Sequence, residues 1–323
     1  MELNLPIFDH LSSCQNLLIA GMGGGFDIFC GLPIYFELQK RVPHVHLANL
    51  SFSDLGVSYY IARRENILIL SDTLVGVTAK TGVFRGYFPE LYLSQWFAEK
   101  KHEDVTVWCF HKTGVQPLLS NYRTLIEHLG IDGILLIDGG VDSLVRGDET
   151  EMATFSEDAV SLCALSQLIE IPTRLMACIG LGAERDISYA HILENIAELA
   201  ANNGFLGSSS LVKKMSVYQD YEDAVLYVQN KRDQEASVIN SSIISAVQGY
   251  YGDYHLTEKT KGSKLWISPL MPIYWFFELE SVVNRHLFLP QLLSTETFSD
   301  VLAAVWTVLH HRQTRSPARI PLS

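Results

Sequence analysis

Four carboxylates and one arginine lie within twelve consecutive residues, directly after the apolar run 133–137. They are Asp138, Asp142, Arg146, Asp148 and Glu149. Carboxylates this close repel one another unless a cation, the arginine or a bound proton offsets their charge. Two kinds of chemistry suit such a group. The acids could hold Mg²⁺ or Ca²⁺, for which Asp138 and Asp142 are the first candidates, or the five residues could form a catalytic group with a general base. The alternative is a structural loop whose acids cap helices and pair with Arg146 and Arg185.

A second candidate for chemistry is the glycine-rich turn GMGGGFD at residues 21–27. It follows the apolar run 17–20 and precedes Pro33, a residue favoured in the first turn of a helix. Glycine permits positive φ and the close approach of a ligand. Gly23, Gly24, Gly25 and Asp27 are therefore predicted to bind a phosphate or carboxylate group. The alternative is a tight corner between a strand and a helix, with no ligand.

The turn departs from two known nucleotide-binding motifs. Phe26 occupies the place of the third glycine of G-x-G-x-x-G, and the next predicted strand ends at Asn49 instead of at an acid. No G-K-[ST] follows the turn, which excludes a P-loop. These departures argue against ordinary NAD-linked hydride transfer.

Elements of regular structure must bring these residues together. Short apolar runs alternate with amphipathic stretches between residues 17 and 201, including a short helix predicted at 59–64. This alternation predicts a doubly wound, mainly parallel, Rossmann-like α/β sheet. Ligands bind such sheets at the carboxyl ends of the strands, so the glycine turn and the acidic loop are expected to face each other across one cleft. The residues that follow other strands join the predicted ligand-binding set: Asn49, Ser51, Gly139, Gly140, Gly180 and Gly182.

The last third of the chain is less regular but shows no repeat or low-complexity tract. We therefore expect a single α/β domain over residues 1–311, with a core at about 14–205 and a helical C-terminal extension at about 206–311. A strand is predicted at 264–268. Residues 312–323 contain two prolines and several basic residues, and are predicted to form a loose tail.

Composition indicates which classes of binding partner to expect. The chain of 323 residues is 48% hydrophobic and carries a net charge of −12, and no run of Lys or Arg is present, so nucleic acid is not expected as a partner. The apolar stretch 265–277 is too short to cross a bilayer and contains two prolines; a subunit interface in a homo-oligomer is one use for it. Five separated cysteines and no signal peptide predict a cytoplasmic protein without a disulfide framework.

Two motifs carry a resemblance. GMGGGFDIFCGLP and LLIDGGVDSLVRGDE are similar to the signature of an uncharacterised family of prokaryotic α/β proteins. The chain resembles this family over about residues 17–293. The step Gly31-Leu32-Pro33 after the glycine cluster also resembles the first turn of sirtuins and deoxyhypusine synthases, which implies a Rossmann-type sheet with a nucleotide-like ligand such as NAD. The four zinc cysteines of the sirtuins are missing, so the resemblance does not imply protein deacetylation.

Two functions follow as expectations. The first is an enzyme that cleaves or transfers a glycosidic or phosphate-linked group of a nucleotide-like, NAD-like small molecule. In this reading the glycine turn holds the phosphate, Asn49 and Ser51 orient the sugar, and Asp138 or Asp142 activates the nucleophile, with Mg²⁺ as a candidate cofactor. The second is a non-catalytic protein that senses a nucleotide at the same place. Converging acids favour the enzyme, because they are costly to keep together for binding alone.

Overall fold

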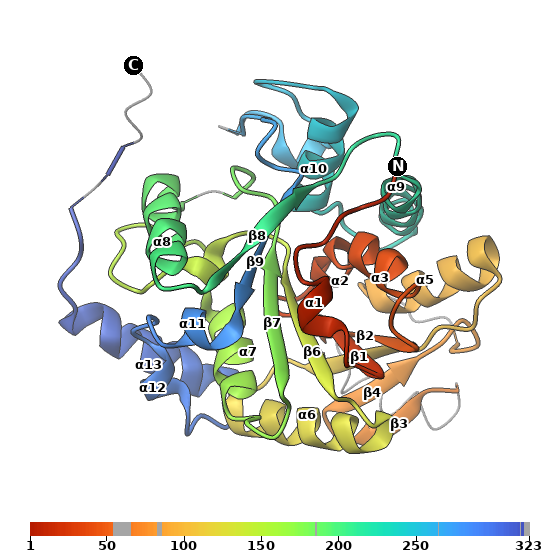
Figure 1. Ribbon diagram of the computed structural model, residues 1–323, viewed down its shortest axis with the longest axis horizontal. Coiled ribbons are helices and arrows are strands. Elements are labelled where there is room, and N and C mark those ends of the chain that lie inside the picture. The colour runs from red at the N-terminus through yellow and green to blue at the C-terminus, as the bar shows by residue number, and fades with distance from the viewer. Residues whose placement is uncertain (54–65, 83–85, 185, 264, 317, 320–323) are drawn as a thin grey trace.

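The computed structural model describes residues 1–53, 66–82, 86–184, 186–263, 265–316 and 318–319 (Figure 1). Within these residues the chain forms one nine-stranded sheet in the order β3-β4-β5-β2-β1-β6-β7-β9-β8. The strands are β1 (Asn16–Gly21), β2 (His44–Ser51), β3 (Leu68–Ser71), β4 (Leu74–Val77), β5 (Val107–His111), β6 (Gly133–Asp138), β7 (Thr173–Cys178), β8 (Phe205–Ser210) and β9 (Ile273–Glu278).

The five central strands, β5, β2, β1, β6 and β7, run parallel. From β1 the chain proceeds outward on one side to β2 and then β5, and later returns to the other side of β1 to form β6 and then β7. The connections therefore diverge between β1 and β6, the switch point at which open α/β sheets bind ligands. The predicted doubly wound, mainly parallel fold is confirmed.

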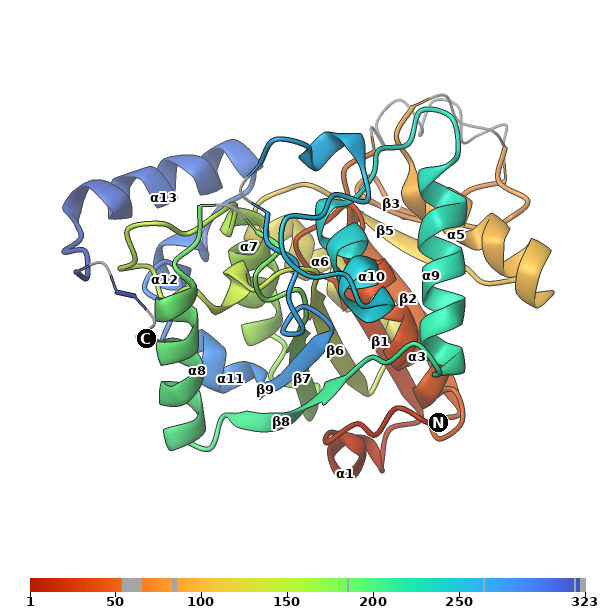
Figure 2. The same cartoon turned by 90° about the horizontal axis from the view of Figure 1, so that it is seen from above.

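Helices cover both faces of the sheet (Figure 2). Alternate residues of β1 point to opposite faces, as the period of a strand requires: Leu17 and Ile19 to one core, Leu18 and Ala20 to the other. The first core is covered by α2 (Asp27–Cys30), α3 (Leu32–Leu38), α5 (Pro89–Trp96), α9 (Ser216–Gln229) and α10 (Val238–Gln248). The second is covered by α6 (Val115–Leu129), α7 (Ser156–Ser166), α8 (Tyr189–Ala201), α11 (Leu279–Val283), α12 (Leu289–Leu292) and α13 (Phe298–His311). The short α1 (Phe8–Leu11) precedes β1.

The C-terminal third differs from the expectation in its strands. It contributes β8 and β9 to the same sheet, whereas the sequence predicted one strand at 264–268. The second half of the apolar stretch 265–277 forms most of β9, which lies between β7 and β8 with Tyr274, Phe276 and Phe277 buried. Burial inside the sheet explains the apolar residues of this half. The helix predicted at 59–64 lies outside the described residues. No helix within the described ranges combines the length and the apolar character needed to cross a membrane.

Candidate functional site

Two cavities open at the carboxyl ends of β1 and β6. The inner cavity, of about 410 Å³, is lined by loops that follow β1, β6 and β7, and the outer cavity, of about 620 Å³, continues it toward the start of α10. Both are lined by Gly23, Asp27, Gly139, Thr154, Val238 and Ile239. The structure thus brings the glycine turn and the beginning of the acidic loop to one cleft at the switch point.

Six acidic residues line the inner cavity, and we call five of them the carboxylate cluster, leaving out the exposed Asp186. They are Asp27 at the start of α2, Asp138 at the end of β6, Asp142 in the 3₁₀ turn Asp142–Leu144, Asp158 in the first turn of α7, and Glu184 after β7. Asp138, Asp142 and Asp158 are each at most 4% exposed. One carboxylate oxygen from each of Asp27, Asp138 and Asp158 can be chosen so that all three lie within 4.8 Å of one another. That spacing suits shared coordination of one divalent cation by oxygen ligands.

Positive partners for this cluster are missing from the described part of the chain. None of its five acids forms an ion pair there with a lysine, arginine or histidine. The Asp158 carboxylate forms no hydrogen bond to any described residue, and its Oδ1 atom is buried without a partner. A buried carboxylate normally has hydrogen bonds or a counter-charge, because removing it from water costs several kcal/mol. The Asp158 carboxyl therefore requires a bound proton or a ligand, and a divalent cation is one ligand that would satisfy it.

Burial and mutual repulsion disturb the acids strongly. Burial raises the pKa of Asp27 to about 8, an effect that the Gly23 amide partly opposes and the charge of Asp142 reinforces. Burial also raises the pKa of Asp138 to about 7, together with the charge of Asp27. The same two causes raise the pKa values of Asp142, Asp158 and Glu184 well above the ordinary range. At neutral pH the cluster thus retains protons unless a bound cation replaces them.

Backbone and hydroxyl donors fix the direction of four of these acids. The Gly23 amide donates to Asp27 Oδ2 (2.6 Å), and the Val141 amide donates to Glu184 Oε2 (2.6 Å). Asp138 Oδ2 accepts from both the amide and the hydroxyl of Ser143. Asp142 Oδ2 accepts from the Thr154 amide (3.2 Å). The cluster is therefore pre-organised by the loops that carry it.

The glycines of both loops make room for these carboxylates. A Cβ atom on Gly139 would lie 2.7 Å from Asp27 Oδ1, and one on Gly140 would lie 2.8 Å from the Glu184 carboxyl carbon. Gly24 and Gly25 have positive φ values of 97° and 59°, as the predicted turn requires. The Gly23 amide, predicted to bind a ligand phosphate, instead donates to the protein's own Asp27. A side chain thus takes the place that a phosphate takes in a dinucleotide site.

Gly140 and four other predicted ligand residues line neither cavity. Asn49 is buried and donates to the Gly25 carbonyl (2.9 Å) and to Glu90 (2.8 Å), so it braces the glycine turn from behind. Ser51 is buried and its hydroxyl accepts from the Ser53 amide. Gly180 and Gly182 have positive φ in the turn that delivers Glu184, where β7 ends. Each supports the site without facing it.

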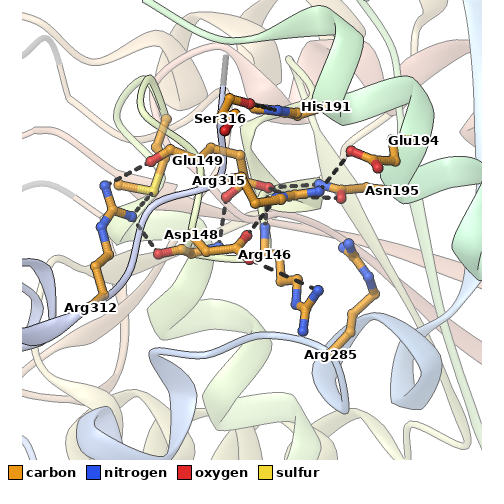
Figure 3. Close-up of polar contacts among 12 residues, drawn as sticks. Arg146, Asp148, Glu149, His191, Glu194, Asn195, Arg285, Arg312, Arg315 and Ser316 are labelled. Atoms are coloured by element: carbon orange, nitrogen blue, oxygen red, sulfur yellow. Dashed lines mark hydrogen bonds and ion pairs between the residues drawn. The ribbon is translucent and has the colours of Figure 1, made fainter. Parts of the chain in front are cut away.

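The second half of the acidic loop points elsewhere, into a network with the C-terminal segment (Figure 3). Arg315 forms ion pairs with Asp148 (2.8 Å) and Glu149 (2.5 Å), and Arg146 approaches Asp148 at 3.9 Å. Burial alone would raise the pKa of Glu149, but the amides of Arg146 and Gly147 and the Asn195 side chain outweigh it and lower that pKa to about 2. Arg146, Asp148 and Glu149 line neither cavity. Their contacts fit the alternative in which this part of the loop is structural and its acids pair with arginines. Arg185, the other arginine of that alternative, lies outside the described residues.

Asp158 is a residue of the site that the sequence pattern does not reveal. Residues 156–158 read as the beginning of a helix, where acids are common because they favour the helix dipole. Asp158 does occupy the first turn of α7, but its side chain lines the inner cavity beside Gly23. The one feature of the sequence that points to a role for Asp158 in the site is its position at the start of the helix that follows the acidic loop.

Aromatic rings distinguish the outer cavity from the inner one. Phe26, Phe52 and Tyr87 line it, and Phe52 is 48% exposed as a residue. Lys259 and Glu235 also line it, paired at 2.7 Å, as does Ser237, whose side chain caps α10. A cavity with flat apolar walls and a few polar groups suits a heteroaromatic ring.

Comparison with known proteins gave one match. Residues 61–308 match the model of a family described as "Protein of unknown function (DUF1152)". Neither the search of curated proteins nor the search of solved structures gave a significant match.

Proposed function

The chain belongs to the DUF1152 family of proteins of unknown function, and since membership brings no reaction with it, we propose from the site itself that the protein is an enzyme dependent on a divalent cation. Its reaction would cleave or transfer a phosphate-linked or glycosidic group of a nucleotide-like small molecule. The match confirms membership of an uncharacterised family, whereas the two signature motifs and the similarity to sirtuins stay predictions.

The observation that carries this proposal is the orphaned Asp158 within a cluster of buried acids. Asp27, Asp138 and Asp158 offer three converging oxygens, the ligand type that Mg²⁺ and Mn²⁺ prefer. Such an ion, when bound, would neutralise the cluster and allow an anionic phosphate to approach it. Without such an ion the five acids either keep their protons and offer no positive charge to a phosphate, or ionise and repel it.

Asp142 is the residue we assign to proton transfer. It lines the inner cavity, is not one of the three converging acids, and is oriented by the Thr154 amide. Its pKa is raised by burial and by Asp138, which brings a carboxylate closer to the range of an effective general base. Asp142 would take a proton from a water molecule or sugar hydroxyl.

The outer cavity supports the nucleotide-like part of the proposal. It adjoins the carboxylate cluster through Gly23, Asp27 and Gly139, and its volume lies within the range of small-molecule sites. A ligand with its phosphate at the cluster would place its ring among Phe26, Phe52 and Tyr87. In this proposal the glycine turn forms part of the cavity wall and does not itself bind the phosphate.

Calorimetry with Mn²⁺ and a thermal-shift screen of nucleotides with and without Mg²⁺ test the proposal, followed by chromatography of the bound ligand to detect product. We expect one or more nucleotides to raise the melting temperature only with the metal and to be converted. Asp142→Asn should retain metal binding and lose about 10²–10⁴-fold in turnover. Asp104→Asn, at an exposed ion pair with Lys80 and outside both cavities, is the matched control.

Two results would count against this function. Absence of Mn²⁺ binding would remove the metal site. Tight, metal-dependent binding of a nucleotide with no product, unchanged in Asp142→Asn, would instead favour the non-catalytic sensor that the sequence left open.

A further inference from the structure

A polar network links the C-terminal segment, through Arg315, to the acidic loop and to α8 (Figure 3). Arg315 pairs with Asp148, Glu149 and Glu194, and its own amide donates to the Asp148 carbonyl (2.7 Å). These contacts join the segment after α13 to the acidic loop and to α8. The sequence predicts a loose tail over residues 312–323, yet Arg312, Arg315 and Ser316 make specific contacts with the body of the domain.

Asn195 transmits these contacts toward the cluster. Its Oδ1 accepts from Arg315 Nη2 (3.1 Å), which fixes the orientation of the amide group. Its Nδ2 then donates to Glu149 Oε1 (2.8 Å) and to the Leu144 carbonyl (3.0 Å). Arg285 donates to the same carbonyl (3.0 Å). Asn195 and Glu149 are almost fully buried, so no bulk water can substitute for a lost partner.

Leu144 is the last residue of the 3₁₀ turn that begins with Asp142. The residue between them, Ser143, donates to Asp138 with both its amide and its hydroxyl. A shift of this turn would therefore move one acid of the cluster and the hydrogen-bond donors of another. Leu144 is the point at which the network meets the site.

Arg312 holds the following part of the loop. Its guanidinium donates to the Gly147 carbonyl and to the Glu149 carbonyl (2.7 Å). It also contacts Met152 Sδ (3.0 Å), two residues before Thr154, whose amide orients Asp142. The segment thus supports Asp142 from two directions.

We propose that Arg315 is a positioning residue for the carboxylate cluster, acting through Asn195 and Glu149 on the turn Asp142–Leu144. The inference rests on the proposed metal-dependent function and deepens it, because it makes residues 312–316 part of the machinery that sets metal affinity. Groups that orient metal ligands from behind typically change affinity by 10–100-fold when removed.

The test compares Arg315→Ala and Arg315→Lys with the wild type. Arg41→Ala, an arginine that stacks on Phe8 at the far end of β1, is the control. Mn²⁺ affinity is measured by calorimetry, and hydrogen exchange is followed for residues 142–154 and for the sheet. We expect Arg315→Ala to bind Mn²⁺ about tenfold or more weakly, with faster exchange in 142–154 and unchanged exchange in β1 and β6. Methylguanidinium in solution should restore part of the affinity, which a general loss of stability would not allow.

Truncation supplies a second arm in case Arg315→Ala does not fold. A chain ending at Ser316 keeps the contacts and should behave as wild type, whereas one ending at His311 should resemble Arg315→Ala. The proposal would be overturned if Arg315→Lys, Arg315→Ala or the shorter chain bound Mn²⁺ as tightly as the wild type. The same variant would also have to show wild-type hydrogen exchange in residues 142–154. If the wild type binds no Mn²⁺, the proposed function fails, and exchange in 142–154 alone decides the role of Arg315.

Discussion

Asp27 and Asp158 meet at Gly23. A Cβ atom built on this glycine would lie 2.8 Å from Oδ2 of each acid, although the two acids belong to helices on opposite faces of the sheet. The missing side chain of Gly23 therefore leaves room for two carboxylates that have no positive partner among the described residues. Such an arrangement is stable only with bound protons or a cation.

Replacing Asp158 by Asn should stabilise the metal-free protein. The change removes a buried carboxylate that has no hydrogen-bond partner, and we expect the free energy of unfolding in EDTA to rise by about 1–3 kcal/mol. Mn²⁺ affinity should fall at least tenfold. Asp132→Asn is the contrasting variant, because the Asp132 carboxylate accepts from the amides of Gln15 and Asn16 and its loss should lower stability. Urea denaturation measures both, and a destabilised Asp158→Asn protein would contradict the cation site.

Metal-free protein should lose stability as the pH rises. In the unfolded chain Asp has its ordinary pKa of 3.8, whereas folding raises the pKa of Asp138 to about 7 and that of Asp27 to about 8. Between about pH 4 and pH 8 the unfolded state binds fewer protons, so the free energy of unfolding falls with pH, by up to about 1.4 kcal/mol per pH unit for each such group.

Saturating Mn²⁺ should remove that fall, because the ion replaces the protons in the folded state. Denaturation series in EDTA and in Mn²⁺ across this range measure the difference. Parallel curves for the two conditions would speak against metal binding by these acids.

Glu149 should act in the opposite direction at low pH. Its pKa falls from the ordinary value of 4.5 to about 2 on folding, so its contribution to stability is complete above about pH 4.5 and is lost as the pH falls toward 2. Glu149→Gln should flatten this acid limb of the stability curve and leave the alkaline limb in place. Glu151→Gln, two residues along and exposed, is the control. An unchanged acid limb in Glu149→Gln would refute the role of the Arg315 network in stability.

Gly23→Ala should damage the site by crowding. The added methyl group would push against both carboxylates, so we expect loss of Mn²⁺ affinity and a destabilisation of about 1–3 kcal/mol. Gly262→Ala is a useful comparison, since Gly262 has φ of 76° but open surroundings and reports only the backbone cost. Equal Mn²⁺ affinity of the Gly23→Ala and wild-type proteins would show that the turn does not shape the site.

Sequence patterns predicted the fold and the edge of the sheet at which the cleft lies, because alternation of strands and helices and glycines after strands are local signals. They did not predict β8, whose residues Phe205–Ser210 are largely polar and include Gly207, or β9, whose apolar residues equally suit an interface. Within the acidic loop, Asp138 and Asp148 look alike in sequence, since each adjoins a glycine. Their difference comes from Arg315, which meets Asp148 from more than 160 residues away and which no local pattern reveals.

The place of β9 has a consequence for biosynthesis. β7 ends at Cys178, but its neighbour in the sheet begins only at Ile273, and β8 pairs with that same late strand. On a ribosome adding roughly 5–20 residues per second, the outer edge of β7 would stay unpaired for roughly 5–20 s. The nascent chain thus carries an unpaired strand edge until almost nine-tenths of it has been translated. A chain released by a stalled ribosome before that point would be prone to aggregate or would require a chaperone.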